Sequence, residues 1–240
     1  MNVLFCSGGK DSVASAILAK IHNEPLDAVV FCEVMFDEET SGEHPLHIEF
    51  VNNKLRPWVE QNLKVPFITL RSDKTYVSLF KHINGKKNKT SGFPIPGMCA
   101  INSRCKMRPI RQFRKDNNIE LEYVGIAVDE PIRLARLTEN KVSLLAKYNY
   151  TEAMAKELCI SYDLLSPIYG ICKRNGCWFC MNCNDRHWMD MIENYPHLFN
   201  KLIELENTHP IRCRECLTRT EKPSEIKERL KLYTNQMSFF

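Results

Sequence analysis

The sequence predicts an α/β protein built on a doubly wound parallel sheet. Short apolar runs rich in β-branched residues alternate along the chain with amphipathic helical patterns, which is the arrangement of parallel α/β folds. The chain has 240 residues, 44% of them hydrophobic, enough for a large domain with its own core. We expect this domain over residues 1–165 and a cysteine-rich helical appendage over residues 166–240.

Four buried strands are expected in the main domain. The apolar runs of strand length lie at residues 3–6, 26–34, 65–70 and 121–128. Two helices are expected between the first three strands, over residues 11–22 and 44–63. Pro57 falls inside the second helix, where a proline bends or breaks the hydrogen-bond ladder.

Further helices follow from capping residues and periodicity. Asn102 or Ser103 is a candidate cap for a basic helix that ends near Asn117, and Thr151 is a candidate cap for a helix that ends near Cys159. Short helices are expected around residues 185–194 and 196–206, with a charged helix in the tail. Glycines and prolines make residues 85–98 a predicted loop.

Composition excludes several classes of protein. No run of 18 apolar residues is present, so no transmembrane helix is expected, and the N-terminus lacks the features of a signal peptide. Eleven cysteines at uneven spacings favour thiols or metal ligands over a disulfide framework, which indicates a reducing compartment. We therefore expect a cytoplasmic protein that does not engage a membrane.

Positive charge is concentrated in residues 85–115. This segment contains nine lysines and arginines and no acid, whereas the net charge of the whole chain is only +4. Such a cluster usually faces phosphate, sulfate or nucleic acid, and the alternative is a solvated loop and helix face.

A glycine-containing loop links the first strand to the first helix. It consists of Ser7, Gly8, Gly9, Lys10, Asp11 and Ser12. Glycines let the backbone approach a ligand closely, and free N–H groups with the helix dipole favour an anion. Lys10 adds positive charge, the serines offer hydroxyl donors, and Asp11 is a candidate to hold Mg²⁺ or to orient the loop. The Walker and Rossmann glycine patterns are both absent.

These six residues resemble the PP-loop signature of the ATP pyrophosphatase superfamily, which includes GMP synthetase, tRNA thiolation enzymes, ATP sulfurylase small subunits and phosphoadenosine phosphosulfate (PAPS) reductases. Three later stretches resemble bacterial and phage-borne members of the PAPS reductase family. They are Lys106-Met-Arg-Pro109, Gly125-Ile-Ala-Val-Asp-Glu-Pro-Ile-Arg133, and Gly176-Cys-Trp-Phe-Cys180 followed by Trp188. The matches span residues 7–188, most of the chain.

The resemblance implies an adenine nucleotide alpha hydrolase-like fold that binds ATP or another adenine nucleotide. Besides residues 7–12, it implicates Lys106, Arg108 and Arg133 in nucleotide binding, and Lys10 and Asp11 in catalysis. Asp129 and Glu130 are further catalytic candidates, because they follow a predicted strand and would lie at the carboxyl edge of the sheet. There they would bind Mg²⁺ or ribose; an N-cap ahead of Pro131 is the alternative for Asp129.

Two departures from the reductases shape the functional expectation. True PAPS reductases relax the Lys-Asp part of the loop, since they need not cleave ATP, and this chain keeps it. They also carry a catalytic cysteine in a C-terminal Glu-Cys-Gly-Leu-His motif, whereas this tail reads Arg212-Cys-Arg-Glu-Cys-Leu217.

We therefore expect an ATP-dependent adenylyl-transfer or sulfur-handling enzyme that forms AMP and pyrophosphate and activates an acceptor for sulfur insertion. The acceptor would be anionic, with DNA and tRNA as candidates, and a cysteine desulfurase is a candidate sulfur donor. A homodimer is one option for the assembly. Alternatives are a sulfonucleotide reductase with a non-standard cysteine, and a nucleic-acid-binding module without turnover.

Cysteines gather in two regions that suggest a metal centre. Thiolates at C-x-x-C spacing suit zinc or an iron–sulfur cluster. The resemblance implies a 4Fe-4S cluster held by Cys177 and Cys180 together with Cys99 and Cys105, although Ile101 and Asn102 occupy the family's usual ligand positions before the lysine. The alternatives are zinc, a local ligand set completed by Cys172 and Cys183, and metal-free thiols. The Cys213-x-x-Cys216 pair suits a second metal site, a redox pair or an ordinary turn.

Overall fold

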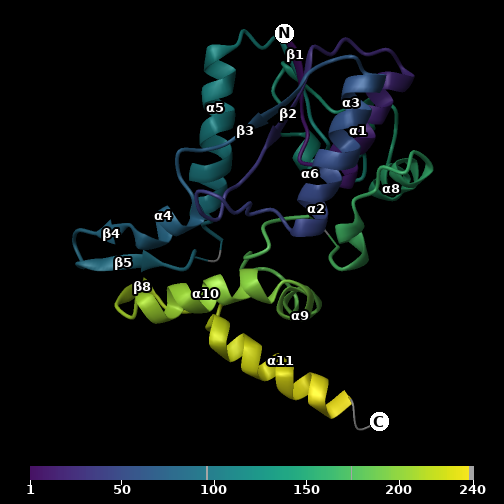
Figure 1. Ribbon diagram of the computed structural model, residues 1–240. Coiled ribbons are helices and arrows are strands. Elements are labelled where there is room, and N and C mark those ends of the chain that lie inside the picture. Colours follow the sequence, from purple (N-terminus) through teal and green to yellow (C-terminus); the bar gives the residue numbers. More distant parts are fainter. Residues whose placement is uncertain (96, 174, 238–240) are drawn as a thin grey trace.

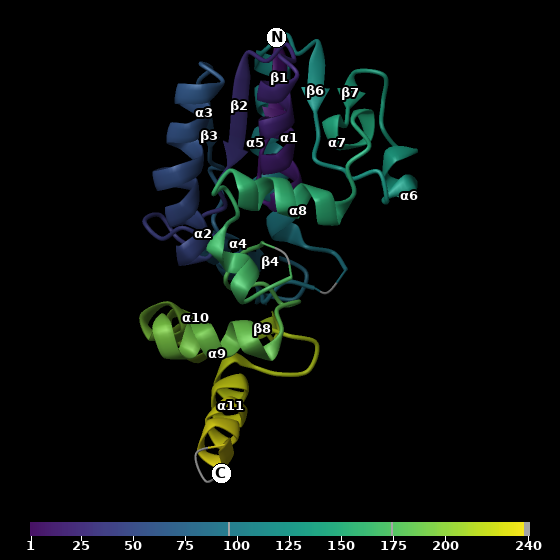
Figure 2. The same cartoon turned by 90° about the vertical axis from the view of Figure 1, so that its right-hand side faces the viewer.

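A computed structural model describes residues 1–95, 97–173 and 175–237. Its centre is a five-stranded, entirely parallel sheet in the order β3-β2-β1-β6-β7 (Figure 2). The strands are β1 (Asn2–Phe5), β2 (Ala28–Cys32), β3 (Phe67–Leu70), β6 (Leu121–Tyr123) and β7 (Lys141–Val142). The predicted α/β class and the four expected strands are confirmed, and β7 is an addition.

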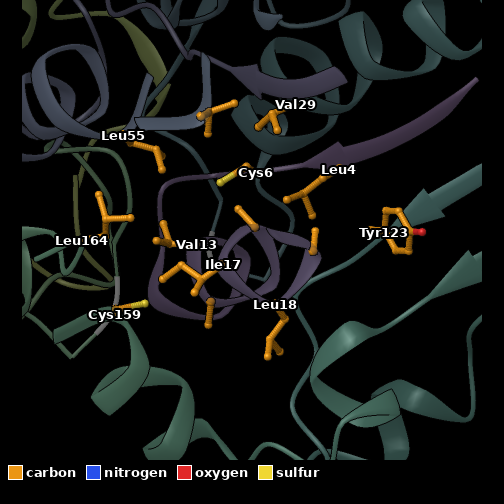
Figure 3. Packing of buried hydrophobic residues seen from close by; sticks show 14 of the residues in the cluster. Leu4, Cys6, Val13, Ile17, Leu18, Val29, Leu55, Tyr123, Cys159 and Leu164 are labelled. Carbon is orange, nitrogen blue, oxygen red and sulfur yellow. The ribbon is translucent and has the colours of Figure 1, made fainter. Parts of the chain in front are cut away.

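Helices cover both faces of this sheet, as the doubly wound class requires. One face carries α1 (Lys10–Ile21), α2 (Pro45–Phe50), α3 (Arg56–Asn62), α7 (Leu144–Lys147) and α8 (Glu152–Ser161). The other face carries α5 (Met107–Asp116), and the short α6 (Pro131–Leu134) lies near the β7 edge (Figures 1 and 2). Leu4, Val13, Ile17 and Leu55 are among the buried residues that join the first face to the strands (Figure 3).

The strand order reverses between β1 and β6. β1 pairs with β2 on one side and with β6 on the other, so Val3 faces Ala28 in one register and Glu122 in the other. Ligands of open α/β sheets bind at the carboxyl edge of the sheet, at a point where the strand order reverses in this way.

The break expected at Pro57 is present. Between α2 and α3 lies a π-helical turn, η1 (Val51–Leu55), and Pro57 occupies the first turn of α3. Proline has no N–H to donate, so the ladder widens before it instead of continuing as an α-helix.

Below the sheet, a second layer surrounds its own core. It contains α4 (Tyr76–Lys81), β4 (Ile83–Asn84), β5 (Lys89–Gly92), the π-helical η2 (Ile101–Lys106), α9 (Asp185–Asn194), α10 (Pro196–Thr208), β8 (Arg212–Arg214) and α11 (Pro223–Met237). The 3-10 turn η3 (Pro167–Gly170) instead packs against α2. β4, β5 and β8 form a small sheet of their own (Figure 1).

Two local expectations for this layer were wrong. Residues 85–98 include half of the β4–β5 hairpin, not only loop. Asn102 and Ser103 do not cap the basic helix, because the chain already turns helically at Ala100 and runs through η2 into α5. Neither polar residue therefore lies at a helix start.

The second core draws aromatic side chains from both parts of the chain. Phe36 and Tyr76 stack at 5.2 Å between ring centroids, and Tyr76 contacts Phe179 at 4.2 Å. Trp178 and Trp188, from the cysteine-rich region, are almost fully buried in the same cluster. The boundary at residue 165 stays a prediction. No helix in the described part of the chain is long and apolar enough to cross a membrane.

Buried histidines lie where the two layers meet. His44 Nε2 lies 3.0 Å from the Asp190 carboxylate, and its ring packs edge-on against His187 and Tyr195. Burial lowers the pKa of His44 to about 4, with a further decrease from neighbouring His187, while Asp190 opposes the change. Burial also lowers the pKa values of His47 and His187.

These shifts predict acid sensitivity of the fold. As the pH falls from about 6.5 towards about 4, the unfolded chain binds protons at these histidines before the folded chain does, so the free energy of unfolding decreases. His44→Gln should reduce that decrease, measured from urea unfolding at about pH 7.5 and about pH 5. His197→Gln, at an exposed histidine of α10, is the matched control. Equal pH dependence in the two variants would contradict the prediction.

Candidate nucleotide and cysteine site

The loop of residues 7–12 leaves β1 at the carboxyl edge of the sheet and opens α1. Gly8 has φ +73°, and a Cβ there would lie 2.8 Å from both the His47 ring and Val51, so only glycine fits. Gly9 is the N-cap residue of α1 and offers no side chain to the first turn. The positive end of the helix dipole is therefore available to bind an anion.

The Ser7 carbonyl is held from two sides. His47 Nε2–H donates to it at 2.9 Å, and Asn175 Nδ2 donates at 3.0 Å. Because the carbonyl only accepts, His47 carries its proton on Nε2, and its Nδ1 accepts from the Ser166 hydroxyl at 2.9 Å. α2 and the cysteine-rich region thus fix the same loop.

Lys10 lies between two carboxylates. Its Nζ is 2.7 Å from Asp11 Oδ1 and 2.7 Å from Glu152 Oε2. Burial opposes the charge, but the hydrogen bonds to these carboxylates raise the pKa of Lys10. Burial also raises the pKa of Asp11, which Lys10 opposes. Lys10 therefore stays protonated and is matched by negative charge without a nucleotide.

A cavity of about 340 Å³ opens over the loop. Ser7, Gly9, Lys10, Asp11, Ser12, Gly125, Glu130, Arg133, Glu152, Tyr169, Lys173 and Asn175 line it. Glu130 and Arg133 pair with each other at 2.5 Å, so the structure brings these two predicted residues to the loop. The Asp129 carboxylate instead accepts the backbone N–H of Glu152 at 3.1 Å, at the start of α8.

Sequence reasoning missed four polar residues of this cavity: Glu152, Tyr169, Lys173 and Asn175. The Tyr169 hydroxyl accepts the N–H of Lys10 at 2.8 Å, although the two residues are 159 positions apart. No local pattern distinguishes such residues. The one available signal was the position of Lys173 and Asn175 within the cysteine-rich stretch of residues 172–183, which we call the cysteine loop.

Lys106 and Arg108 have different surroundings. Burial raises the pKa values of Cys6, Cys32 and Cys177, and the charge of Lys106 opposes the rise at each. Lys106 does not line the cavity over residues 7–12, and its part in nucleotide binding stays a prediction. Arg108 pairs with Asp73 at 3.1 Å and lines a separate cavity beyond β3.

The cysteine loop is anchored to the segment after β2. Cys177 forms a β-bridge with Glu43, and Trp178 donates its backbone N–H to Gly42 and its indole N–H to Ser41 at 3.0 and 2.9 Å. A cavity of about 220 Å³ beside this anchor contains Cys172, Cys177, Cys180, Cys183 and His187 in its lining.

The four predicted metal ligands lie in one region without forming a site. Burial raises the pKa of Cys177, and Cys180 and Cys99 add to the rise; burial raises the pKa of Cys105 to about 11, and Cys99 again adds to it. Yet among the described residues no three His, Cys, Asp or Glu side chains are gathered so as to hold a metal ion. The thiols suit a cluster chemically, and the cluster and its ligand set stay a prediction.

One solved structure similar to this chain is U34-tRNA thiolase NcsA from Methanococcus maripaludis with its 4Fe-4S cluster. The alignment has a TM-score of 0.42 and 14% sequence identity, and it covers 87% of this chain and 66% of that one. The chain thus spans about two thirds of the length of that protein. No family model and no curated protein matches the sequence.

Nucleotide binding by the loop is testable at Lys10. Lys10→Ala should weaken ATP binding by about 1.5–3 kcal/mol, because it removes a charge-assisted contact to phosphate. Calorimetric titration with Mg²⁺ present measures the change. Lys156→Ala, an exposed lysine on the helix that carries Glu152, should bind ATP normally. Unchanged affinity in Lys10→Ala would refute the assignment.

The metal prediction separates two ligand sets. We expect iron and sulfide in protein purified anaerobically, held by Cys99, Cys105, Cys177 and Cys180. Cys105→Ser should then lose the metal, and Cys183→Ser should keep most of it, as measured by elemental analysis of variants with wild-type unfolding midpoints. The reverse result would move the site to the local set with Cys172 and Cys183. Zinc without iron or sulfide would exclude the cluster.

Proposed function

We propose that the protein is an ATP-dependent enzyme that transfers an adenylyl group to an acceptor, releases pyrophosphate, and then inserts sulfur into the activated acceptor. One observation carries the proposal. Asn175, which holds the nucleotide loop at Ser7, lies two residues before Cys177 in the chain. An activated acceptor at the loop is therefore within reach of a cluster of thiols.

Residues 7–12 would bind the β- and γ-phosphates, which leave together as pyrophosphate. Attack by the acceptor in line on the α-phosphorus builds negative charge, which the helix N-terminus, Lys10 and Arg133 are placed to offset. Catalysis of this kind consists mainly of positioning and charge neutralisation.

Mg²⁺ would enter the same cavity together with the nucleotide, since the carboxylates of Asp11, Glu130 and Glu152 line it. Magnesium is commonly held by one or two carboxylates together with the phosphates of the nucleotide. When bound, the ion would neutralise phosphate charge. Asp11 and Glu130 would orient it, and Asp129 would support Glu152 through its backbone N–H.

The thiols would carry the sulfur. A persulfide on one cysteine, loaded by a donor such as a cysteine desulfurase, displaces AMP from the adenylated acceptor and forms a mixed disulfide. A second thiol attacks that disulfide, releases the thiolated product and leaves a cysteine disulfide, which an external thiol reduces. Cys172 and Cys183, which are not among the predicted cluster ligands, are the candidates for these roles, since both line the cavity of about 220 Å³.

An anionic acceptor fits the unpaired positive charge of the basic segment. Lys86, Lys87, Lys89 and Arg104 form no ion pair with any residue that the structure describes. DNA and tRNA are the acceptors that we propose, since both present phosphate to such a surface.

The reaction products test the proposal. With Mg²⁺, a sulfur source and bulk tRNA or DNA as acceptor, we expect radiolabelled ATP to give AMP and pyrophosphate on chromatography. Lys10→Ala should slow this by about 10²–10³-fold, as for the loss of a group that stabilises transition-state charge. Lys156→Ala is again the matched control.

ADP as the main product would refute adenylyl transfer. ATP binding with no cleavage under any of these conditions would favour a binding module, and reduction of a sulfonucleotide would favour a reductase.

A further inference from the structure

A large cavity lies beside the β4–β5 hairpin in the second layer, away from the nucleotide loop. Its volume is about 680 Å³, within the range of small-molecule sites. α4, the hairpin, residues 92–95 and the start of η2 form its walls. The described lining includes no carboxylate.

The inner wall is aromatic and contains a hydroxyl without a partner. Phe80 and Phe93 meet edge to face at 5.0 Å between ring centroids. Tyr76 also lines the cavity and is 1% exposed, and its hydroxyl has no hydrogen-bond partner among the described residues. The hydroxyl therefore has a hydrogen-bonding capacity that no described residue satisfies, at the edge of the cavity that Tyr76 lines.

The rim of the cavity is basic. Lys86 and Arg104 line it, and Lys87 and Lys89 lie on the same hairpin (Figure 1). These four cations lack ion-pair partners in the described chain, whereas Arg114 of the same basic segment is bound to Glu122 at 2.6 Å. An apolar cavity with an unneutralised basic rim suits a ligand that has both a flat ring and a phosphate.

We propose that this cavity binds an unpaired nucleobase of a single-stranded nucleic acid, with the hairpin cations on the flanking phosphates. Aromatic side chains and a hydrogen-bonding group that receive an unstacked base, next to cations that follow the backbone, are the usual means of binding single strands. An apolar peptide would pack against the aromatic wall but would leave the cations of the rim without ion-pair partners.

The cavity is also next to the thiols. Met98 and Ala100, on either side of Cys99 in the chain, both line it. Phe179, between Cys177 and Cys180 in the chain, contacts Tyr76 at 4.2 Å between ring centroids, so this part of the cysteine loop packs against the inner wall. The inference deepens the proposed function, on which it rests for its biological purpose, because it identifies the acceptor side of the same site.

Fluorescence anisotropy without ATP tests the cavity directly. The probes are a labelled single-stranded oligouridine and an abasic strand of equal length and charge. The base-containing strand should bind at least about tenfold more tightly, because each stacked base contributes to affinity. Tyr76→Phe keeps the ring and removes the hydroxyl, so it should weaken binding of oligouridine about fivefold and leave the abasic strand unaffected.

Two double variants test the rim. Lys86→Ala with Arg104→Ala should weaken both strands about tenfold and flatten the salt dependence. Arg111→Ala with Lys115→Ala removes two exposed cations of α5 that do not line the cavity, and it should have little effect. Urea unfolding midpoints show whether each variant retains the fold.

Equal affinity for the two strands, no effect of Tyr76→Phe, or equal effects of the two double variants would overturn the proposal. Because no ATP is present, strand binding that follows these expectations alongside failed ATP cleavage would remove the proposed function and keep the cavity assignment. ATP cleavage without base-dependent binding would keep the proposed function and remove the cavity assignment.

Discussion

The hydrogen bonds to the Ser7 carbonyl are the constraint on which the rest of the site depends. His47 and Asn175 both donate to this one oxygen. His47 comes from α2, beside the parallel sheet, and Asn175 comes from the cysteine-rich region. The geometry needs a defined tautomer of His47, which the Ser166 hydroxyl fixes at Nδ1. Burial lowers the pKa of His47, so the ring is neutral and keeps this arrangement at neutral pH.

At the carboxyl edge of the sheet, the backbones after β1 and β6 approach each other more closely than side chains would allow. A Cβ on Gly125, which follows β6, would lie 2.6 Å from the amide nitrogen of Ser12, and one on Gly8 would enter the His47 ring. The two glycines let the ends of β1 and β6, the first turn of α1, and α2 meet around one point. The reversal of strand order places that point at the carboxyl edge of the sheet.

The sequence predicted the structure correctly where a local pattern of residues determines it. Buried parallel strands are short apolar runs, and Thr151 caps α8 as expected because its side chain accepts the N–H of Met154. The β4–β5 hairpin escaped prediction because Lys89–Gly92 is polar and has no apolar alternation. The sequence analysis assigned both Lys106 and Arg108 to nucleotide binding. Positions two apart in a helical segment do not share a face, however, and Arg108 forms an ion pair with Asp73 instead. Contacts such as Tyr169 with Lys10 depend on the packing of distant segments, which no spacing along the chain reveals.

The charges around Lys10 show how such a site can stay folded when it holds no nucleotide. Asp11 and Glu152 both form ion pairs with the Lys10 ammonium. The ammonium is partly buried, where an unpaired cation would be strongly disfavoured. In the function that we propose, phosphates that reach Lys10 would release the two carboxylates to face the cavity, where they would supply oxygen donors to a magnesium-bound nucleotide. The ion pairs would thus exchange partners, and neither the lysine nor the carboxylates would need to become unpaired. A lysine without these neighbours would have no ion pair to break on meeting phosphate, but the empty loop would then carry an uncompensated charge against the positive end of α1.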